Sequence, residues 1–162
     1  MRSVQLHLSS RCPEDTLAIA RALGSCLAGG DLVALTGDLG AGKTLFCKGI
    51  GESLGISPGN ITSPSFTIAT RHEARLPLTH VDVYRLESVV EALEIGLDEM
   101  FAGEGVCVVE WAEKVTELLP TDCVRVTFTI SDEDERAISV SAPDQPRFHG
   151  FLSRSQRFQP GG

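Results

Sequence analysis

The chain has 162 residues, which suits one domain with a single hydrophobic core. Apolar residues make up 42% of the sequence, so the chain can bury enough surface to fold, which excludes the class of intrinsically disordered proteins. The net charge of -8 argues against a protein that binds nucleic acid by itself, because phosphate contacts need Lys and Arg.

The first third of the chain alternates strand and helix patterns. Apolar and polar residues alternate from Val4 to Leu8, which predicts a half-buried strand. Pro13 then suits the first turn of a helix, and apolar residues recur at helical spacing until Gly29. The continuous apolar run Leu32–Thr36 is typical of a buried parallel strand, and residues 44–54 can form the next helix.

The segment between that strand and that helix, Gly37–Thr44, matches the pattern G-x-x-x-x-G-K-[ST]. Glycines let backbone N–H groups converge on phosphates, and the N-terminus of the helix adds partial positive charge. Lys43 can reach the β- and γ-phosphates, and the Thr44 hydroxyl can bind Mg²⁺. We therefore expect a P-loop that binds ATP or GTP with Mg²⁺. The loop residues expected on the nucleotide are Asp38, Leu39, Gly40, Ala41, Gly42, Lys43, Thr44 and Leu45.

A P-loop site needs a further carboxylate at the end of a neighbouring strand. Residues Leu78–Leu86 are expected to form a strand, and alternation places His80, Asp82 and Tyr84 on one of its faces. Asp82 is the candidate carboxylate, because a charge within a strand needs a partner such as Mg²⁺. The alternative is a surface strand whose polar face meets water. His80 is expected to pack or to hydrogen-bond rather than to ligate a metal.

A second candidate carboxylate, Glu110, follows the apolar strand Val106–Val109. Functional groups of open α/β sheets lie at the carboxyl ends of strands, so Glu110 can hold the metal or orient the attacking water. A carboxylate that merely begins a helix is the alternative. Trp111 follows, and it either stacks on an adenine ring or fills the core. Lys43, Asp82 and Glu110 are the expected catalytic residues.

A loop rich in Ser, Thr and Pro lies between the P-loop helix and a strand expected at Phe66–Thr70. Thr62 and Ser65 have hydroxyl groups that can sense Mg²⁺ or the γ-phosphate, as in a switch loop. An ordinary surface loop is the alternative.

The C-terminal third begins with alternating strands at Val124–Ile130 and around Ile138, which predict an antiparallel hairpin. After Ala142 the composition shifts to Pro, Gly, Gln, Ser and Arg, which indicates a mobile tail. We therefore expect an ATPase domain at 1–141 and a tail at 142–162. The expected fold is a three-layer α/β/α P-loop NTPase with a mostly parallel central sheet and a C-terminal antiparallel hairpin.

Four motifs together resemble the bacterial TsaE (YjeE) family over residues 1 to about 141: the P-loop, the Thr62–Phe66 loop, His80–Leu86 and Val109–Lys114. The resemblance implies a Mg²⁺-dependent ATPase required for the tRNA modification N6-threonylcarbamoyladenosine (t6A37). It implies action on the TsaB–TsaD pair, which the ATPase resets between turnovers, with tRNA bound only indirectly. The roles that it implies are Lys43 on phosphate, Thr44 and Glu110 near Mg²⁺, Asp82 as an essential carboxylate, Trp111 near adenine, and Thr62 and Ser65 in the switch loop.

Two other functions remain open at this point. One is a nucleotide-gated binding module with incidental hydrolysis, and the other is a small-molecule kinase, for which the short chain shows no arginine-bearing lid. ATP rather than GTP follows from the resemblance, from Trp111 and from the lack of an N-K-x-D stretch. The five scattered cysteines indicate a reducing compartment, and the sequence lacks an apolar run of ~20 residues that could span a membrane. We therefore expect a cytoplasmic protein that does not associate with a membrane.

Overall fold

The computed structural model describes residues 2–38, 40–62 and 68–160. The strands are β1 (Ser3–Ser10), β2 (Leu32–Gly37), β3 (Ala69–His72), β4 (Leu78–Asp82), β5 (Val106–Glu110), β6 (Val124–Ile130) and β7 (Arg136–Pro143). The α-helices are α1 (Pro13–Gly24), α2 (Lys43–Ser53), α3 (Val89–Glu94), α4 (Leu97–Phe101) and α5 (Pro146–Arg154). The 3₁₀ helices are η1 (Pro58–Asn60), η2 (Ala112–Leu118) and η3 (Gln156–Phe158).

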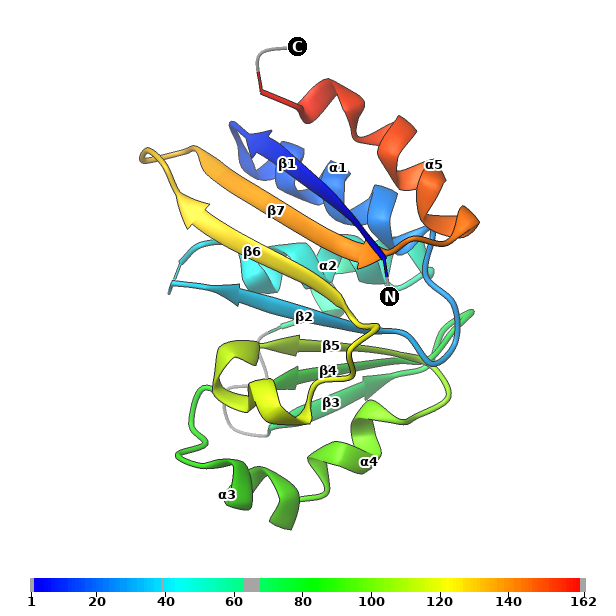
Figure 1. The fold of residues 1–162 in the computed structure, drawn as a ribbon, viewed down its shortest axis with the longest axis vertical. Coiled ribbons are helices and arrows are strands. Elements are labelled where there is room, and N and C mark those ends of the chain that lie inside the picture. The colour runs from blue at the N-terminus through cyan, green and yellow to red at the C-terminus, as the bar shows by residue number, and fades with distance from the viewer. Residues whose placement is uncertain (1, 39, 63–67, 161–162) are drawn as a thin grey trace.

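All seven strands form one sheet in the order β1-β7-β6-β2-β5-β4-β3 (Figure 1). The four central strands are parallel, since β2 pairs with β6 and β5, and β5 pairs with β4. Antiparallel pairs lie at both edges, β1 and β7 beside β6 and β3 beside β4. The expected hairpin is β6–β7, and the mostly parallel centre of the expected fold is confirmed.

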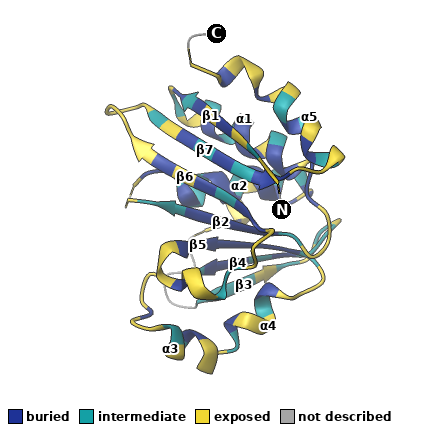
Figure 2. Cartoon of the chain, in the orientation of Figure 1, coloured by how far each residue is buried: buried dark blue, intermediate teal, exposed yellow. Residues whose placement is uncertain are grey.

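Helices cover the two faces of this sheet unequally. Helices α1, α2 and α5 bury the apolar side chains of one face, and α3, α4 and η2 cover the other. Strand β5 is buried at every position, as expected for a strand with layers on both sides. Strand β6 alternates between buried and more exposed residues, because no helix among the described residues covers the outer face of the β1–β7–β6 region (Figure 2). The three-layer α/β/α arrangement is therefore complete only over β2, β5 and β4.

Helix α2, which carries the end of the phosphate loop, packs closely against α1. A Cβ atom at Gly49 would lie 2.5 Å from the Ala20 Cβ and 2.9 Å from the Leu17 carbonyl oxygen. Only glycine allows the two helix backbones to approach so closely. This contact helps to fix the direction in which the N-terminus of α2 points.

The expected division into a domain at 1–141 and a mobile tail at 142–162 is wrong. Strand β7 runs through Pro143, and α5 and η3 pack back onto the sheet and α1. Phe148, Phe151 and Phe158 are buried in the larger hydrophobic core. Three aromatic side chains remove enough apolar surface from water to hold a short helix in place. Residues 142–160 are thus part of the single domain.

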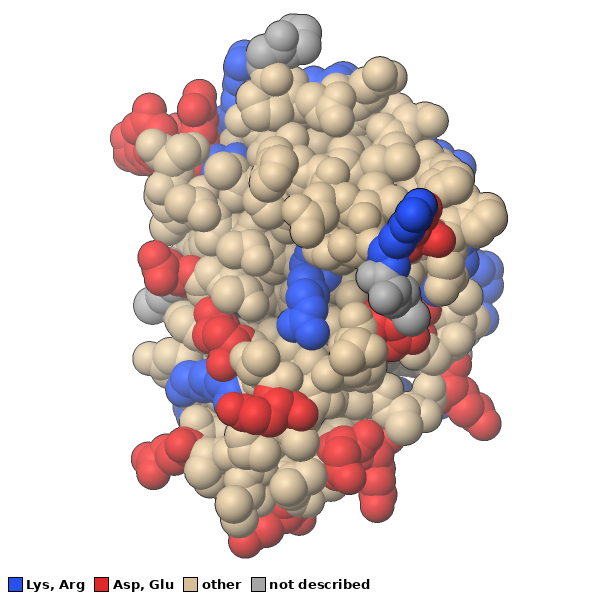
Figure 3. Space-filling model, in the orientation of Figure 1, with Lys and Arg blue, Asp and Glu red and all other residues tan. Residues whose placement is uncertain are grey.

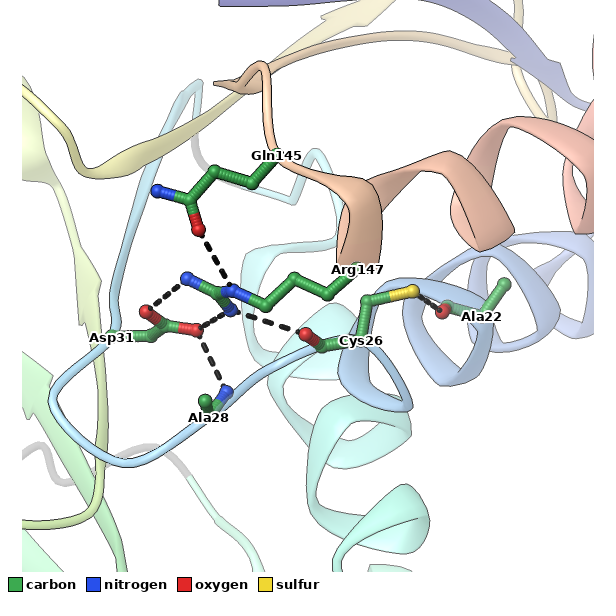
Figure 4. A network of polar contacts seen from close by, with 6 residues as sticks. All are labelled: Ala22, Cys26, Ala28, Asp31, Gln145 and Arg147. Atoms are coloured by element: carbon green, nitrogen blue, oxygen red, sulfur yellow. Dashed lines mark hydrogen bonds and ion pairs between the residues drawn. The ribbon is translucent and has the colours of Figure 1, made fainter.

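A polar cluster anchors the start of α5 to the turn before β2 (Figure 4). The Arg147 guanidinium forms two hydrogen bonds with the Asp31 carboxylate, of which Nη2 to Oδ1 spans 2.8 Å. It also donates to the Cys26 carbonyl at 3.1 Å, and Asp31 accepts from the Ala28 N–H at 2.8 Å. A paired fork of this kind fixes orientation as well as distance.

Two expected strands differ in length from those observed. The strand expected at Leu78–Leu86 ends at Asp82, because the Asp82 carboxylate accepts from the Tyr84 N–H at 2.9 Å and turns the chain. Tyr84 therefore leaves the sheet instead of sharing its face with His80. The strand expected at Phe66–Thr70 appears as β3 from Ala69, and Phe66 lies outside the described residues.

Candidate nucleotide-binding site

The predicted phosphate loop joins β2 directly to α2. Helix α2 begins at Lys43, and Gly42 before it has φ 110° and ψ 17°, a left-handed conformation that favours glycine. The buried strand and the closely packed helix hold the two ends of the loop. The amide groups at the start of α2 consequently face outward at the carboxyl edge of the sheet, where a helix N-terminus attracts anions. Leu39 lies outside the described residues.

The Lys43 side chain bends back and contacts the backbone of the preceding loop. Its side chain is buried, with 5% exposed, and Nζ donates to the carbonyl oxygens of Gly37 at 2.5 Å and Asp38 at 2.8 Å. Burial lowers the pKa of Lys43, although the nearby Glu110, Glu113, Asp82 and Asp38 carboxylates oppose this effect. A buried ammonium group with neutral partners is ready to exchange them for an anion.

Thr44 and Glu110 meet although 66 residues separate them in the chain. The Thr44 hydroxyl lies 2.9 Å from Glu110 Oε1 and 3.0 Å from Oε2. Thr44 stands on the first turn of α2, and Glu110 ends β5, which is parallel to β2. Two of the three expected metal ligands, Thr44 and Glu110, are therefore adjacent at the same edge of the sheet.

His80 supports the same carboxylate from the neighbouring strand. Its ring is fully buried, and Nε2 lies 2.5 Å from Glu110 Oε2. Burial disfavours the imidazolium, but Cys47 and Glu110 outweigh that effect and raise the pKa of His80 to about 10. The expectation that His80 hydrogen-bonds rather than ligates a metal agrees with this contact.

Asp82 lies beside Glu110. The two residues pair in register at the carboxyl ends of parallel strands β4 and β5. Within residues 2–38, 40–62 and 68–160, no three His, Cys, Asp or Glu side chains lie close enough to hold a metal ion alone. Mg²⁺ rarely needs such a cage, because one or two carboxylates and the phosphates of its substrate usually hold it. Asp82, Glu110 and Thr44 fit that donor set.

Trp111 has the only positive φ among the described residues other than glycine, with φ 62° and ψ 37°. A bulky residue in this region is strained, and such strain is concentrated at functional sites. The indole lies between two groups: Lys43 Nζ is 3.9 Å from its ring centroid, and the Tyr84 ring centroid is 4.8 Å away. Trp111 thus adjoins the phosphate loop, and its expected contact with adenine stays a prediction.

Three neighbours of the site, Arg136, Tyr84 and Lys114, were not among the predicted site residues. Arg136 at the start of β7 donates to the Gly40 carbonyl at 3.3 Å, across 96 residues of chain. It also borders a pocket of about 120 Å³ beside the loop, lined in part by Thr16 and Leu45. Tyr84 contacts Trp111, and Lys114 donates to the Tyr84 carbonyl. Only the folded chain brings these residues together.

The expected switch loop lies largely outside the described residues. Thr62 is described and exposed, whereas Ser65 is not described. The sensing role of both hydroxyls stays a prediction.

Comparisons with known proteins agree on one family. The family model described as "Threonylcarbamoyl adenosine biosynthesis protein TsaE" matches residues 10–138. A protein of Bacillus subtilis named "tRNA threonylcarbamoyladenosine biosynthesis protein TsaE" is 46% identical over 85% of this chain and 86% of its own length. One of the same name from Treponema pallidum is 42% identical, over 82% of this chain and 97% of its own.

The fold agrees as well. The crystal structure of Bacillus subtilis YdiB is 40% identical in sequence, with a TM-score of 0.73 and coverage of 97% of both chains. None of the helices formed by the described residues is both long enough and apolar enough to span a membrane. The family model, the relatives and the shared fold together establish that this chain belongs to the TsaE family of tRNA threonylcarbamoyladenosine biosynthesis proteins.

Proposed function

We propose that the chain is a Mg²⁺-dependent ATPase that acts on the TsaB–TsaD pair in tRNA threonylcarbamoyladenosine biosynthesis. One observation carries the proposal: the hydroxyl of Thr44, the residue that follows Lys43, bonds to the buried Glu110 carboxylate. P-loop NTPases use this set of groups, a lysine for phosphate with a hydroxyl and a carboxylate for the metal. The names of the curated relatives place those proteins in t6A biosynthesis, and this supports the proposal that the chain acts in the same process.

The chain's own groups have distinct roles in this proposal. Lys43 leaves the Gly37 and Asp38 carbonyls and pairs with the β- and γ-phosphates, where it and the loop amides stabilise developing negative charge. Thr44 and Glu110, which already touch, would hold Mg²⁺. When bound, the ion would neutralise negative charge on the phosphates. Asp82 accepts a hydrogen bond from the attacking water and orients it.

The main alternative is a binding module in which nucleotide binding matters and hydrolysis is incidental. An ATPase uses both carboxylates, Glu110 for the metal and Asp82 for the attacking water, whereas a binding module needs no group that orients water. Asp82→Asn distinguishes an ATPase from a binding module, since it leaves Thr44 and Glu110, the proposed metal ligands, intact.

The test measures ATP turnover and t6A formation over many cycles, with and without the TsaB–TsaD pair. We expect the wild-type chain to turn over ATP faster with the pair. Asp82→Asn should bind Mg-ATP but lose about 100-fold or more in turnover and support only single-cycle modification. Undiminished multiple-cycle t6A formation by Asp82→Asn without hydrolysis would favour the binding module.

A further inference from the structure

Exposed apolar side chains are concentrated in one short segment. Of the five large hydrophobic residues that are exposed within residues 2–38, 40–62 and 68–160, four lie between residues 84 and 95. They are Tyr84, Val90, Leu93 and Ile95, which are 53%, 64%, 46% and 38% exposed. We call these four residues the α3 patch. Single exposed apolar residues are ordinary, whereas exposed apolar residues that are concentrated in one part of a surface are typical of interaction sites.

The α3 patch is held on a fixed support. Val90 and Leu93 are three residues apart on α3, so they share one side of the helix. Ala92 on the same helix is buried in the smaller hydrophobic core with Leu97 and Phe101 of α4. The helix also has a capped start, because the Ser88 hydroxyl accepts from the Glu91 N–H at 3.1 Å. The exposed side is therefore presented to solvent by a packed, capped element.

Negative charge surrounds this apolar surface. Residues 84–99 contain five carboxylates and one arginine, and Figure 3 shows red side chains gathered around the α3 and α4 end of the molecule. The carboxylates are Glu87, Glu91, Glu94, Asp98 and Glu99. This rim repels nucleic acid and favours a protein surface with an apolar centre bordered by Lys and Arg.

The patch is connected to the phosphate loop through ring contacts. Tyr84 belongs to the patch, and its ring centroid lies 4.8 Å from that of Trp111. Lys43 Nζ lies 3.9 Å from the Trp111 ring on the site side. Lys114 of η2 holds Tyr84 by a hydrogen bond to its carbonyl and lies 4.9 Å from its ring. A partner that moves Tyr84 therefore changes the surroundings of the phosphate-binding lysine.

We propose that the α3 patch and its acidic rim form the surface that docks a partner protein with an apolar centre bordered by Lys and Arg, and that docking acts on the nucleotide site through Tyr84 and Trp111. The inference rests on the proposed function, in which the occupant is the TsaB–TsaD pair. A pair that modifies tRNA needs cationic surface to hold it, so charge complementarity with this rim is expected.

The test compares Leu93→Asp with Ile130→Asp. Leu93 and Ile130 are 46% and 44% exposed, and Ile130 lies outside the patch at the end of β6. The measurements are the Kd for the cognate TsaB–TsaD pair and, separately, the Kd of the isolated chain for Mg-ATP. Leu93→Asp should weaken pair binding by about 30-fold or more, with Mg-ATP binding unchanged. Ile130→Asp should change neither. Val90→Asp, at a more exposed position, is the second patch variant.

A separate variant tests whether docking acts on the nucleotide site through Tyr84. Tyr84→Ala removes the ring that meets Trp111, so it should reduce the stimulation of ATP turnover by a saturating amount of the pair. Val90→Asp at the same saturation should retain full stimulation, because it alters docking alone.

Other outcomes overturn parts of the account separately. Equal pair affinity for wild type, Leu93→Asp and Val90→Asp would overturn the docking surface. A wild-type dimer in light scattering that Leu93→Asp converts to a monomer would assign the patch to a second copy of the chain and overturn the partner. Loss of pair binding in Leu93→Asp with no Mg-ATP binding by wild type would support the surface and refute the ATPase.

Discussion

The parallel and antiparallel halves of the sheet bury different kinds of side chain. Around β2, β5 and β4 the buried groups include Lys43, His80 and Glu110, which meet at the carboxyl edge. Beside β6, β7 and β1 the core contains the aromatic residues of α5, such as Phe148 and Phe151. Buried charge is unfavourable unless it is paired, whereas buried aromatic surface stabilises the fold. The candidate site therefore lies in the first half, and the aromatic packing of α5 lies in the second.

The largest expected effect is a loss of folding stability when the aromatic core around α5 is disrupted. Phe151→Ala removes a fully buried ring and should lower the free energy of unfolding by about 3–5 kcal/mol. Urea denaturation followed by circular dichroism measures this change. Mg-ATP affinity of the folded variant should stay within about twofold of wild type, since the ring is remote from the phosphate loop. A large loss of affinity in the folded variant would contradict the division between the halves.

The second prediction concerns pH and the functional half. Because the pKa of His80 is raised from 6.5 to about 10, the folded state holds this proton more tightly than the unfolded state. The stabilisation is complete below about pH 6.5 and is lost as the pH rises towards 10, by at most ~1.4 kcal/mol per pH unit for one proton. Unfolding free energies between about pH 7 and 9.5 should fall more steeply for wild type than for His80→Gln. Parallel slopes would show that His80 does not hold this proton.

A smaller effect is expected at the anchor of α5. Arg147→Ala removes the fork on Asp31 and should cost about 1–2 kcal/mol of stability, because the pair is only partly buried. Arg147→Lys keeps the charge but not the two parallel bonds, so it should recover less than half of the loss. Full recovery by lysine in thermal denaturation would mean that charge alone anchors the helix.

The smallest effect on stability is expected for Thr44→Ala, which should nevertheless have a large effect on Mg-ATP binding. Thr44→Ala removes the hydroxyl that meets Glu110 and should lower stability by about 1 kcal/mol. Mg-ATP affinity should fall about tenfold or more, and Thr44→Ser should restore it. Calorimetric titration of both variants checks this, and unchanged affinity in Thr44→Ala would remove Thr44 from the metal site.

The two halves also differ in how far the sequence predicts them. The phosphate loop and Glu110 follow from local patterns, since a glycine-rich turn and a strand end are each contained in a few residues. The packing of α5 does not, because three phenylalanines are dispersed among Pro, Arg, Gln and Ser. Its anchor Arg147 binds Asp31, which is 116 residues away. The contact of Arg136 with Gly40 is equally remote, and no local pattern reports such a pair.

The most direct test of the account is calorimetric titration of ATP with and without Mg²⁺ into wild type and Lys43→Ala, together with Trp111 fluorescence. Trp111 is the only tryptophan in the chain, and Lys43 lies against it. We predict Mg²⁺-dependent binding and a fluorescence change in wild type, with affinity about 100-fold or more lower in Lys43→Ala. Equal affinity in the two proteins, or no binding by wild type, would contradict the claim that this loop binds nucleotide.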